Sequence, residues 1–242
     1  MAENSEYAIN TRQSLIVYIC ICAIMFMSIL FGSVGISHTI ALHGYYTRNL
    51  LILFVVFWLV TFVAQLLNNI IISKKQTTCT SPNNYSGHNV FLITLMPWIF
   101  VLGIFMVLLY FIPGLLRIFA NTIGMSIMYD TFKTEINAEI NVVRQNQTFS
   151  SDDLKAIYIK ISNEPQLIIN EIEYADDTEF ESIYAKYNLS FPYIFIKNDT
   201  FKRRIKQLII SKNLIGYSIW IALVGTIASL ISTNAMINVE CG

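Results

Sequence analysis

Charged side chains are scarce in this sequence of 242 residues, and four long stretches contain none at all. No Asp, Glu, Lys or Arg occurs at residues 13–47, 49–73, 76–116 and 213–239. Only 13% of the residues are charged, 55% are hydrophobic, and the mean hydropathy is +0.54. Soluble domains carry about 25% charged residues. The composition therefore excludes an ordinary water-soluble globular protein and predicts one that folds in a lipid bilayer.

Each uncharged stretch contains an apolar core long enough for one transmembrane helix. The hydrocarbon core of a bilayer is about 30 Å thick, which takes about 20 helical residues to cross. The sequence predicts four such helices, at residues 15–37, 50–72, 90–112 and 214–236. The first is predicted to be a retained span rather than a cleaved signal peptide, because its apolar run exceeds the roughly 7–15 residues of a signal-peptide core.

The charges missing from the spans are concentrated between the third and fourth of them. Residues 117–212 hold 12 of the 16 basic and 13 of the 16 acidic residues. This segment is therefore predicted to be a water-facing domain, and the spacing of its apolar residues predicts that it is mostly helical. One run, residues 191–196, has the pattern of a strand. Because the charge of the segment is nearly balanced, no nucleic acid is expected as a partner.

The predicted fold class is mainly α, a polytopic membrane protein with four transmembrane helices and a mostly helical water-facing domain between the third and fourth. Its parts are an N-terminal tail at 1–13, three spans within 14–116, the domain at 117–212, the fourth span at 213–238 and a C-terminal tail at 239–242.

The sidedness of the spans follows from the basic residues near their ends, which favour the cytosolic side of a membrane. Four spans place both termini on one side and the domain on the other. The terminal side has Arg12, Lys74 and Lys75. The domain side has seven such residues: Arg48, Arg117, Lys202, Arg203, Arg204, Lys206 and Lys212. The domain is therefore predicted to be cytosolic and the termini lumenal or external.

The four cysteines divide into two pairs. Cys20 and Cys22 lie inside the first predicted span, where they act as small apolar residues. Cys79 and Cys241 lie just outside the membrane on the predicted lumenal or external side, where disulfides can form. A bond between them would tie the loop after the second span to the C-terminal end. Two free thiols are the alternative, because a disulfide depends on a geometry that the sequence does not contain.

Four polar residues, Thr61, Gln65, Asn68 and Asn69, share one helical face of the second predicted span. Polar groups inside a membrane need hydrogen-bonding partners and can mark a polar pathway. None of these side chains ionises, so a proton or ion pathway would lack its usual carboxylate. Interhelical hydrogen bonding is therefore the favoured interpretation.

Small residues recur every three or four positions along the fourth predicted span. They form a ridge that consists of Ser218, Ala222, Gly225, Thr226 and Ser229. Such ridges let helix backbones approach closely. The ridge is predicted to pack against another helix, either within the bundle or in a second copy of the chain, whereas Ile221 is predicted to face lipid.

A sharp break, Pro113-Gly114, follows the third predicted span, because Pro lacks the backbone N–H that a helix needs and Gly permits turn conformations. The mostly apolar residues 115–128 that follow are predicted to lie along the membrane interface. Their buried face would consist of Leu116, Phe119, Ile123 and Ile127. A core helix of the water-facing domain is the alternative.

A basic cluster, Lys202, Arg203, Arg204 and Lys206, precedes the fourth predicted span. Basic residues at this position attract anionic lipid headgroups, with about 1 kcal/mol for each residue. Headgroup contacts are one interpretation of the cluster, and a plain topological anchor is the other.

No pattern in the sequence predicts catalysis, a cofactor or a metal site. The acidic run at residues 171–181 lacks the spacing and the central Gly of an EF-hand loop. His38, His43 and His88 lack the spacing of metal ligands. Catalytic triads, phosphate-binding loops and paired-cysteine zinc motifs are missing as well. The chain is therefore predicted not to be an enzyme.

The run Pro113-Gly114-Leu115-Leu116-Arg117-Ile118-Phe119-Ala120-Asn121-Thr122-Ile123-Gly124 resembles a motif in multi-pass internal-membrane and capsid-associated proteins of nucleocytoplasmic large DNA viruses. In that group a Pro-Gly break after a span is followed by an aromatic residue, Asn, Thr and Gly. A C-terminal span that ends in an Asn and a Cys, here Asn234 or Asn238 and Cys241, is similar too. The chain departs from the group at Leu115, where an aromatic residue is expected. The resemblance implies a component of the virion's internal membrane, without catalytic residues.

Two functional hypotheses follow. The first is a structural multi-pass membrane protein, a scaffold or minor capsid-linked component of a viral internal membrane or of the host endoplasmic reticulum membrane. Its partners would be the lipid bilayer, other membrane or capsid proteins, and further copies of the chain. The alternative is a channel or transporter subunit, with the polar face of the second span lining a pathway.

Overall fold

The computed structural model describes residues 12–27, 45–76, 87–146, 152–172, 177–190 and 199–237. Almost every one of these residues is helical, and they contain no strand. The prediction of a mainly α chain is therefore confirmed for this part of the protein. The predicted strand at residues 191–196 lies outside the described ranges.

The first described element is a helix at Arg12–Met27, here called the N-terminal helix. Its other elements are α2 (Tyr45–Gln76), α3 (Gly87–Pro97), η2 (Trp98–Gly103), α4 (Ile104–Phe111), α5 (Pro113–Phe119), η3 (Ala120–Gly124), α6 (Met125–Asn146), α7 (Asp152–Asn163), α8 (Gln166–Ile169), α9 (Asp177–Ser190) and α10 (Asp199–Ile237). The two η elements are π-helical, with hydrogen bonds between residues five apart.

Three helices among the described residues are long and apolar enough to cross a membrane. They lie at Val55–Lys74, His88–Leu109 and within Asp199–Ile237. The N-terminal helix Arg12–Met27 is shorter, because at 1.5 Å per residue it measures about 24 Å, less than the hydrocarbon thickness. The described residues thus contain three candidate spans, fewer than the four predicted, and residues 28–37 of the predicted first span lie outside them.

The chain divides into two compact units. One, here called the apolar unit, comprises residues 1–28, 50–115 and 218–242, and the other, the charged unit, comprises 29–49 and 116–217. The second part of α10 belongs to the apolar unit and its first part to the charged unit. The division between the two units falls at 217–218, and Lys212 and Gly216 both make close contacts within the charged unit.

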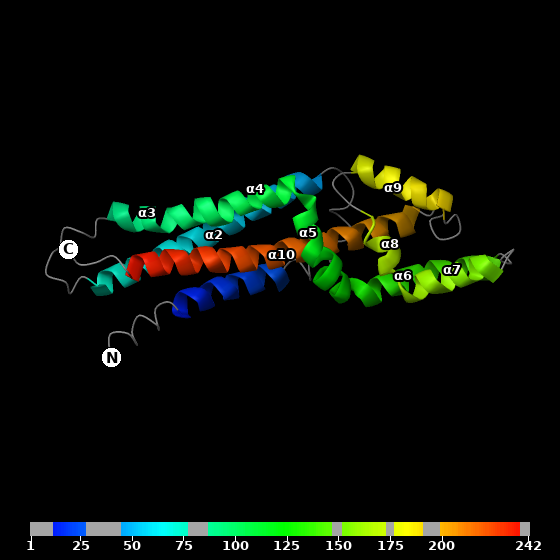
Figure 1. Ribbon diagram of the computed structural model, residues 1–242, viewed down its shortest axis with the longest axis horizontal. Coiled ribbons are helices and arrows are strands. Elements are labelled where there is room, and N and C mark those ends of the chain that lie inside the picture. The colour runs from blue at the N-terminus through cyan, green and yellow to red at the C-terminus, as the bar shows by residue number, and fades with distance from the viewer. Residues whose placement is uncertain are drawn as a thin grey trace. The chain divides into compact units, whose positions relative to one another are not determined.

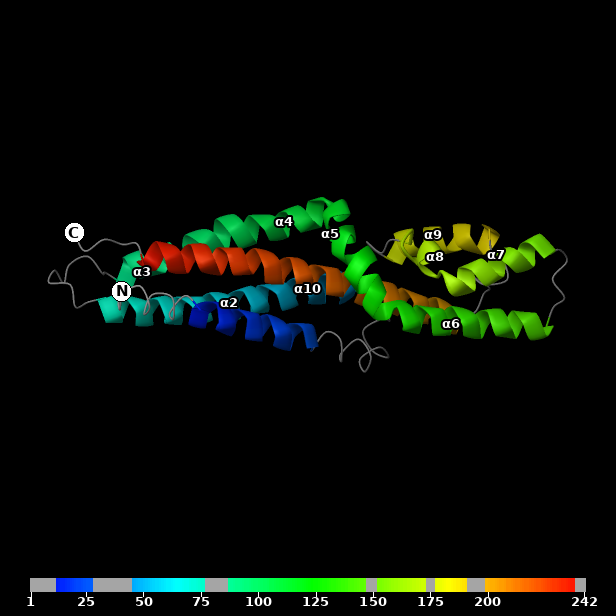
Figure 2. The ribbon, with the colours of Figure 1, turned by 60° about the horizontal axis from the view of Figure 1, so that its bottom comes forward.

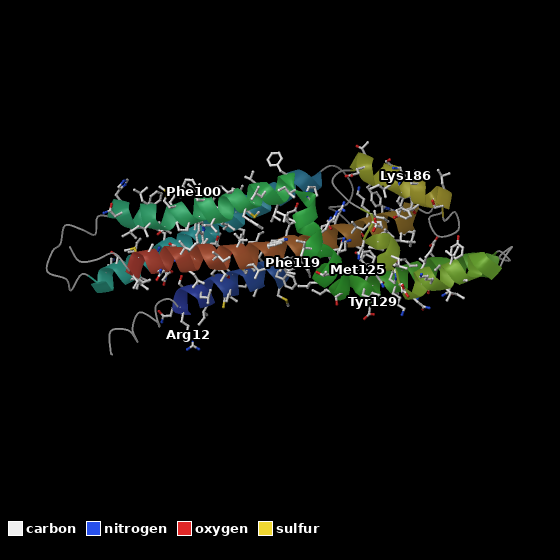
Figure 3. The ribbon with its side chains drawn as sticks, viewed as in Figure 1. Arg12, Phe100, Phe119, Met125, Tyr129 and Lys186 are labelled. Carbon is white, nitrogen blue, oxygen red and sulfur yellow. The ribbon has the colours of Figure 1, made fainter. Side chains whose placement is uncertain are left out.

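In the apolar unit, the second part of α10 lies beside the N-terminal helix, α2 and the α3–η2–α4 run (Figures 1 and 2). Large apolar side chains cover its outside, and Phe100 on η2 projects outward with 60% of its surface exposed (Figure 3). Its interior instead contains buried Gln65, Asn69 and Ser232. An apolar outside around a polar inside suits lipid rather than water as the surrounding solvent.

The predicted break after the third span occurs at Ile112, whose backbone (φ −121°, ψ 81°) leaves the helical region. Pro113 explains this, because a proline disfavours the helical conformation in the residue before it and suits the first position of the next helix. Gly114 needs no special conformation: no described glycine has a positive φ, and Gly114 lies inside α5. Its predicted role in a turn is therefore wrong.

In the charged unit, α6 and α7 pack side by side as an antiparallel pair (Figure 2). The short α8, α9 and the first part of α10 complete the unit. Its core contains Phe132, Ile136, Ile169, Phe180 and Ile205, all fully buried. The prediction that this segment is mostly helical is confirmed for its described residues.

Candidate functional site

The polar side chains of the apolar unit meet in one buried hydrogen-bonded network. Gln65 and Asn69 lie four residues apart on α2, so both project from the same face of the helix. Both are buried. Gln65 Nε2 donates to Asn69 Oδ1 at 3.1 Å, which joins the two amides directly.

Gln65 uses all of its hydrogen-bonding capacity. Its Oε1 accepts from the hydroxyls of Ser14 and Ser229, both at 2.8 Å. Its Nε2 donates to Thr233 Oγ1 at 2.9 Å as well as to Asn69. An amide side chain has two donors and two acceptor sites, so none is left over. Gln65 thereby connects α2 to the N-terminal helix and to α10.

Asn69 extends the network to a fourth helix. Its Nδ2 donates to Thr94 Oγ1 on α3 and to Ser232 Oγ on α10, both at 2.8 Å. The Thr94 hydroxyl in turn donates a hydrogen bond to the carbonyl of Val90 at 2.8 Å. The network therefore connects the N-terminal helix, α2, α3 and α10 through side chains that carry no charge.

The other two residues of the predicted polar face lie outside this network. Thr61 is buried, but its hydroxyl bonds to its own helix, at the carbonyls of Phe57 (2.9 Å) and Trp58 (3.1 Å). Asn68 is half-buried, and its Nδ2 has no hydrogen-bond partner within the described part of the chain. The predicted face is therefore split between two amides that join helices and two residues that do not.

A small cavity lies between the N-terminal helix and α2. Its volume is about 10 Å³, which is the space of about one water molecule. The side chains around it are those of Ser14, Val17, Tyr18, Ile21, Thr61, Ala64, Gln65 and Asn68. A cavity of this size has room for a single water molecule and is not by itself a pathway.

Sequence reasoning missed the partners of the two amides. Ser232 and Thr233 follow Ser229 at three and four residues on α10, so their shared face could have been read from the sequence. Ser14 and Thr94 are single polar residues in apolar helices, and no sequence pattern distinguishes them. Their roles depend on which helices are neighbours.

The small-residue ridge of α10 packs against the N-terminal helix. Ser218, Gly225 and Ser229 are buried, while Ala222 and Thr226 are half-buried. A Cβ atom added to Gly225 would stand 1.7 Å from Tyr18 Oη, a severe overlap. The ridge thus contacts a helix of the same chain.

The prediction that Ile221 faces lipid is wrong. Ile221 is 1% exposed, and its backbone carbonyl accepts a 2.8 Å hydrogen bond from Tyr18 Oη. The exposed side of α10 instead carries Leu223 and Ile227.

A second polar cluster surrounds Lys212 in the charged unit. Lys212 is 1% exposed. Its Nζ donates to Asn121 Oδ1 at 2.8 Å, and to the Ile169 carbonyl and Asn170 Oδ1 at 3.3 Å each. Burial, followed by the charge of Arg117, lowers the pKa of Lys212 to about 8, and Glu171 opposes this shift. The sequence had offered Lys212 only as a marker of topology.

Two glycines allow η3 and α10 to approach closely around Lys212. A Cβ at Gly124 would stand 2.6 Å from the Lys212 carbonyl oxygen, and one at Gly216 would stand 2.9 Å from the backbone nitrogen of Ala120. The Ala120–Gly124 part of the run at residues 113–124 therefore has a packing role. Asn121 supplies a ligand for the buried amine, and Gly124 supplies the space.

The basic cluster before the fourth span has partners inside the charged unit. Lys202 forms an ion pair with Glu181, and Arg204 binds both carboxylate oxygens of Glu135 at 2.8 and 3.1 Å. Lys206 Nζ lies 5.9 Å from the centre of the Phe180 ring. The remaining member, Arg203, donates to the Asp199 carbonyl at 3.3 Å. Each member of the cluster therefore has a contact inside the charged unit.

The predicted disulfide partners Cys79 and Cys241 both lie outside the described residues. Across the described ranges, no group of three or more His, Cys, Asp or Glu side chains is arranged to hold a metal ion. In comparisons with known proteins, no protein-family model, no curated protein and no solved structure matches this chain.

Proposed function

We propose that this chain is a structural multi-pass membrane protein whose apolar unit is a fixed helical bundle. The observation that carries the proposal is the closed network around Gln65 and Asn69, which joins four helices. An amide left unpaired in an apolar interior costs about 1–3 kcal/mol. Sliding one helix past another would break several of these bonds at once, so the network favours one arrangement of the bundle.

The viral part of the proposal rests on the resemblance of residues 113–124 to internal-membrane proteins of large DNA viruses. A fixed bundle whose chain also forms a charged unit suits a scaffold or minor capsid-linked component of such a membrane. The partners would be lipid, other membrane or capsid proteins, and further copies of the chain. Its location would be the virion's internal membrane or the endoplasmic reticulum membrane of the host.

Mass spectrometry of purified particles tests this assignment. The chain should remain with the particle membrane after the outer layers are removed, and chemical cross-linking should connect it to capsid proteins. Recovery in cellular membranes alone, with none in particles, would contradict the viral role.

A channel or transporter subunit is the alternative function. The cavity beside Asn68 and the unpaired Asn68 Nδ2 are the observations in its favour. The small volume of that cavity and the complete pairing of Gln65 argue against a pathway. Flux through proteoliposomes that Gln65→Leu abolishes would support the alternative and contradict the structural role.

A further inference from the structure

The stretch that leads from α5 into α6 is apolar on both sides. Residues 118–129 contain no charged side chain. On one side, Leu116, Ala120, Gly124 and Met128 recur every fourth position and are buried. These residues belong to the core of the charged unit, so this side matches the core-helix interpretation of the sequence.

The opposite side exposes Ile118 together with Ile123 and Ile127, two of the four residues that the sequence predicted to share a buried face. Ile123 is 41% exposed, and Ile118 and Ile127 are exposed to a similar degree. Ile118 and Ile123 lie five residues apart, which is the hydrogen-bond spacing of the π-helical η3 between them. Ile127 follows four residues later on α6. The three isoleucines are here called the outer isoleucine row.

Thr122, a polar residue next to this row, has its hydroxyl satisfied by its own helix. Thr122 is exposed, and its hydroxyl donates to the carbonyl of Ile118. Such an intrahelical bond is what a hydroxyl needs where water is scarce. The three isoleucines are themselves apolar, and the other exposed hydroxyl of the stretch belongs to Ser126.

The position of the row along the chain indicates what covers it. α5 begins directly after α4 and Ile112, and Phe111 and Ile112 are themselves exposed apolar residues just beyond the candidate span His88–Leu109. The uncharged stretch ends at Tyr129, and charged residues follow it from the exposed Asp130 onward. Phe119, Met125 and Tyr129 mark the course of this stretch (Figure 3).

We propose that the outer isoleucine row lies on the surface of the bilayer, with its side chains at the boundary between headgroups and acyl chains, while its opposite side forms the core of the charged unit. An apolar face that continues directly from a span suits lipid as its cover. The proposal rests on the membrane role proposed above. It does not need the basic cluster, whose side chains have partners inside the charged unit.

Site-specific photo-cross-linking of the full chain in phosphatidylcholine–phosphatidylglycerol vesicles tests this proposal. Benzoylphenylalanine is introduced at Ile123, and separately at Ile118, and lipid adducts are detected by mass spectrometry. Ile157 on α7 is the matched control, since it is an isoleucine of the charged unit with 44% exposure. Phe100 is the positive control, because it projects outward from a candidate span.

We expect lipid adducts at positions 118 and 123 with a yield close to that at 100, and none at 157. Adducts at 100 without any at 118 or 123 would overturn the proposal and leave the membrane role intact. Cross-links from 123 to a second copy of the chain would overturn it too. A lack of lipid adducts at all positions, including 100, would contradict the membrane role and this proposal together.

Discussion

Tyr18 fills the space that a side chain at position 225 would need. The Tyr18 hydroxyl stands 1.7 Å from the place where a Cβ on Gly225 would lie, and it donates to the Ile221 carbonyl at 2.8 Å. The ring also meets Trp98 edge to face, with 6.1 Å between the ring centres. The glycine thus lets one aromatic residue bridge the N-terminal helix, α10 and η2.

Gly225→Leu should therefore destabilise the protein. Its side chain cannot fit without moving Tyr18, and overpacking of this kind costs about 1–3 kcal/mol. The unfolding temperature in detergent measures the effect. Ile227→Leu on the exposed side of α10 is the matched control and should be nearly neutral. Equal unfolding temperatures for the two variants would mean that the contact between Tyr18 and Gly225 is unimportant.

Two glycine-to-alanine changes should act in opposite directions. Gly124→Ala should lower stability, because its Cβ would stand 2.6 Å from the Lys212 carbonyl oxygen. Gly114→Ala should raise stability by up to about 1 kcal/mol, since Gly114 is helical, nothing lies within 4 Å of its Cβ position, and Ala favours helices. Chemical denaturation of both variants measures the difference. A destabilising Gly114→Ala would contradict the helical assignment of α5.

Lys212 should make the stability of the protein depend on alkaline pH. Its pKa is about 8 in the folded chain, against about 10.4 for an unperturbed lysine. Between these values the unfolded chain binds more protons, so the contribution of Lys212 to stability increases as pH rises. The gain over this window is roughly 3 kcal/mol.

Lys212→Met, which keeps most of the apolar stem, is the reference for this measurement. The free energy of unfolding of the natural chain minus that of the variant should be constant below about pH 8 and should rise above it. A difference that does not change with pH would show that the Lys212 amine is not held in a desolvated site.

The sidedness of the chain predicts which acceptor patterns for N-linked sugar can be used. These patterns begin at Asn84, Asn146, Asn188 and Asn198. Only Asn84 is predicted to be lumenal, so only Asn84 should be modified in a microsomal insertion assay. Replacing each Asn with Gln identifies the modified site. Sugar on Asn146, Asn188 or Asn198 would invert the topology.

Much of the helical architecture could be predicted because hydropathy and helical spacing are properties of a continuous segment. α10 is an example: the uncharged stretch at 213–239 predicted a span at 214–236, and the structure contains those residues in one helix, Asp199–Ile237. The face shared by Gln65 and Asn69 was predictable for the same reason, since residues four apart in a helix point the same way.

The partners of these residues could not be predicted, because they depend on packing between distant segments. Ser14 and Thr94 become significant only when their helices lie beside α2. The π-helical η3 shifts the helical phase, so Ile123 and Ile127 face outward instead of joining Leu116 in the core. The Lys212 amine donates to uncharged oxygens, which belong to Asn121 on η3 and to Ile169 and Asn170.

The network predicts that Gln65 and Asn68 differ in importance although they lie three residues apart on α2. Gln65→Leu should lower stability by about 1–2 kcal/mol, because it breaks four hydrogen bonds, three of which join α2 to other helices. Asn68→Leu should have little effect, since the Nδ2 of Asn68 has no partner in the described part of the chain. Unfolding in detergent compares the two, and equal losses of stability would contradict the special role of Gln65.

The central claim, that the polar interior holds the bundle together and is not a pathway, is tested most directly in proteoliposomes that contain either the natural chain or Gln65→Leu. Ion flux and thermal stability are measured on the same preparations. The account predicts flux no greater than that of empty vesicles for both proteins, with lower stability for the variant. Flux through the natural chain that Gln65→Leu abolishes without any loss of stability would contradict it.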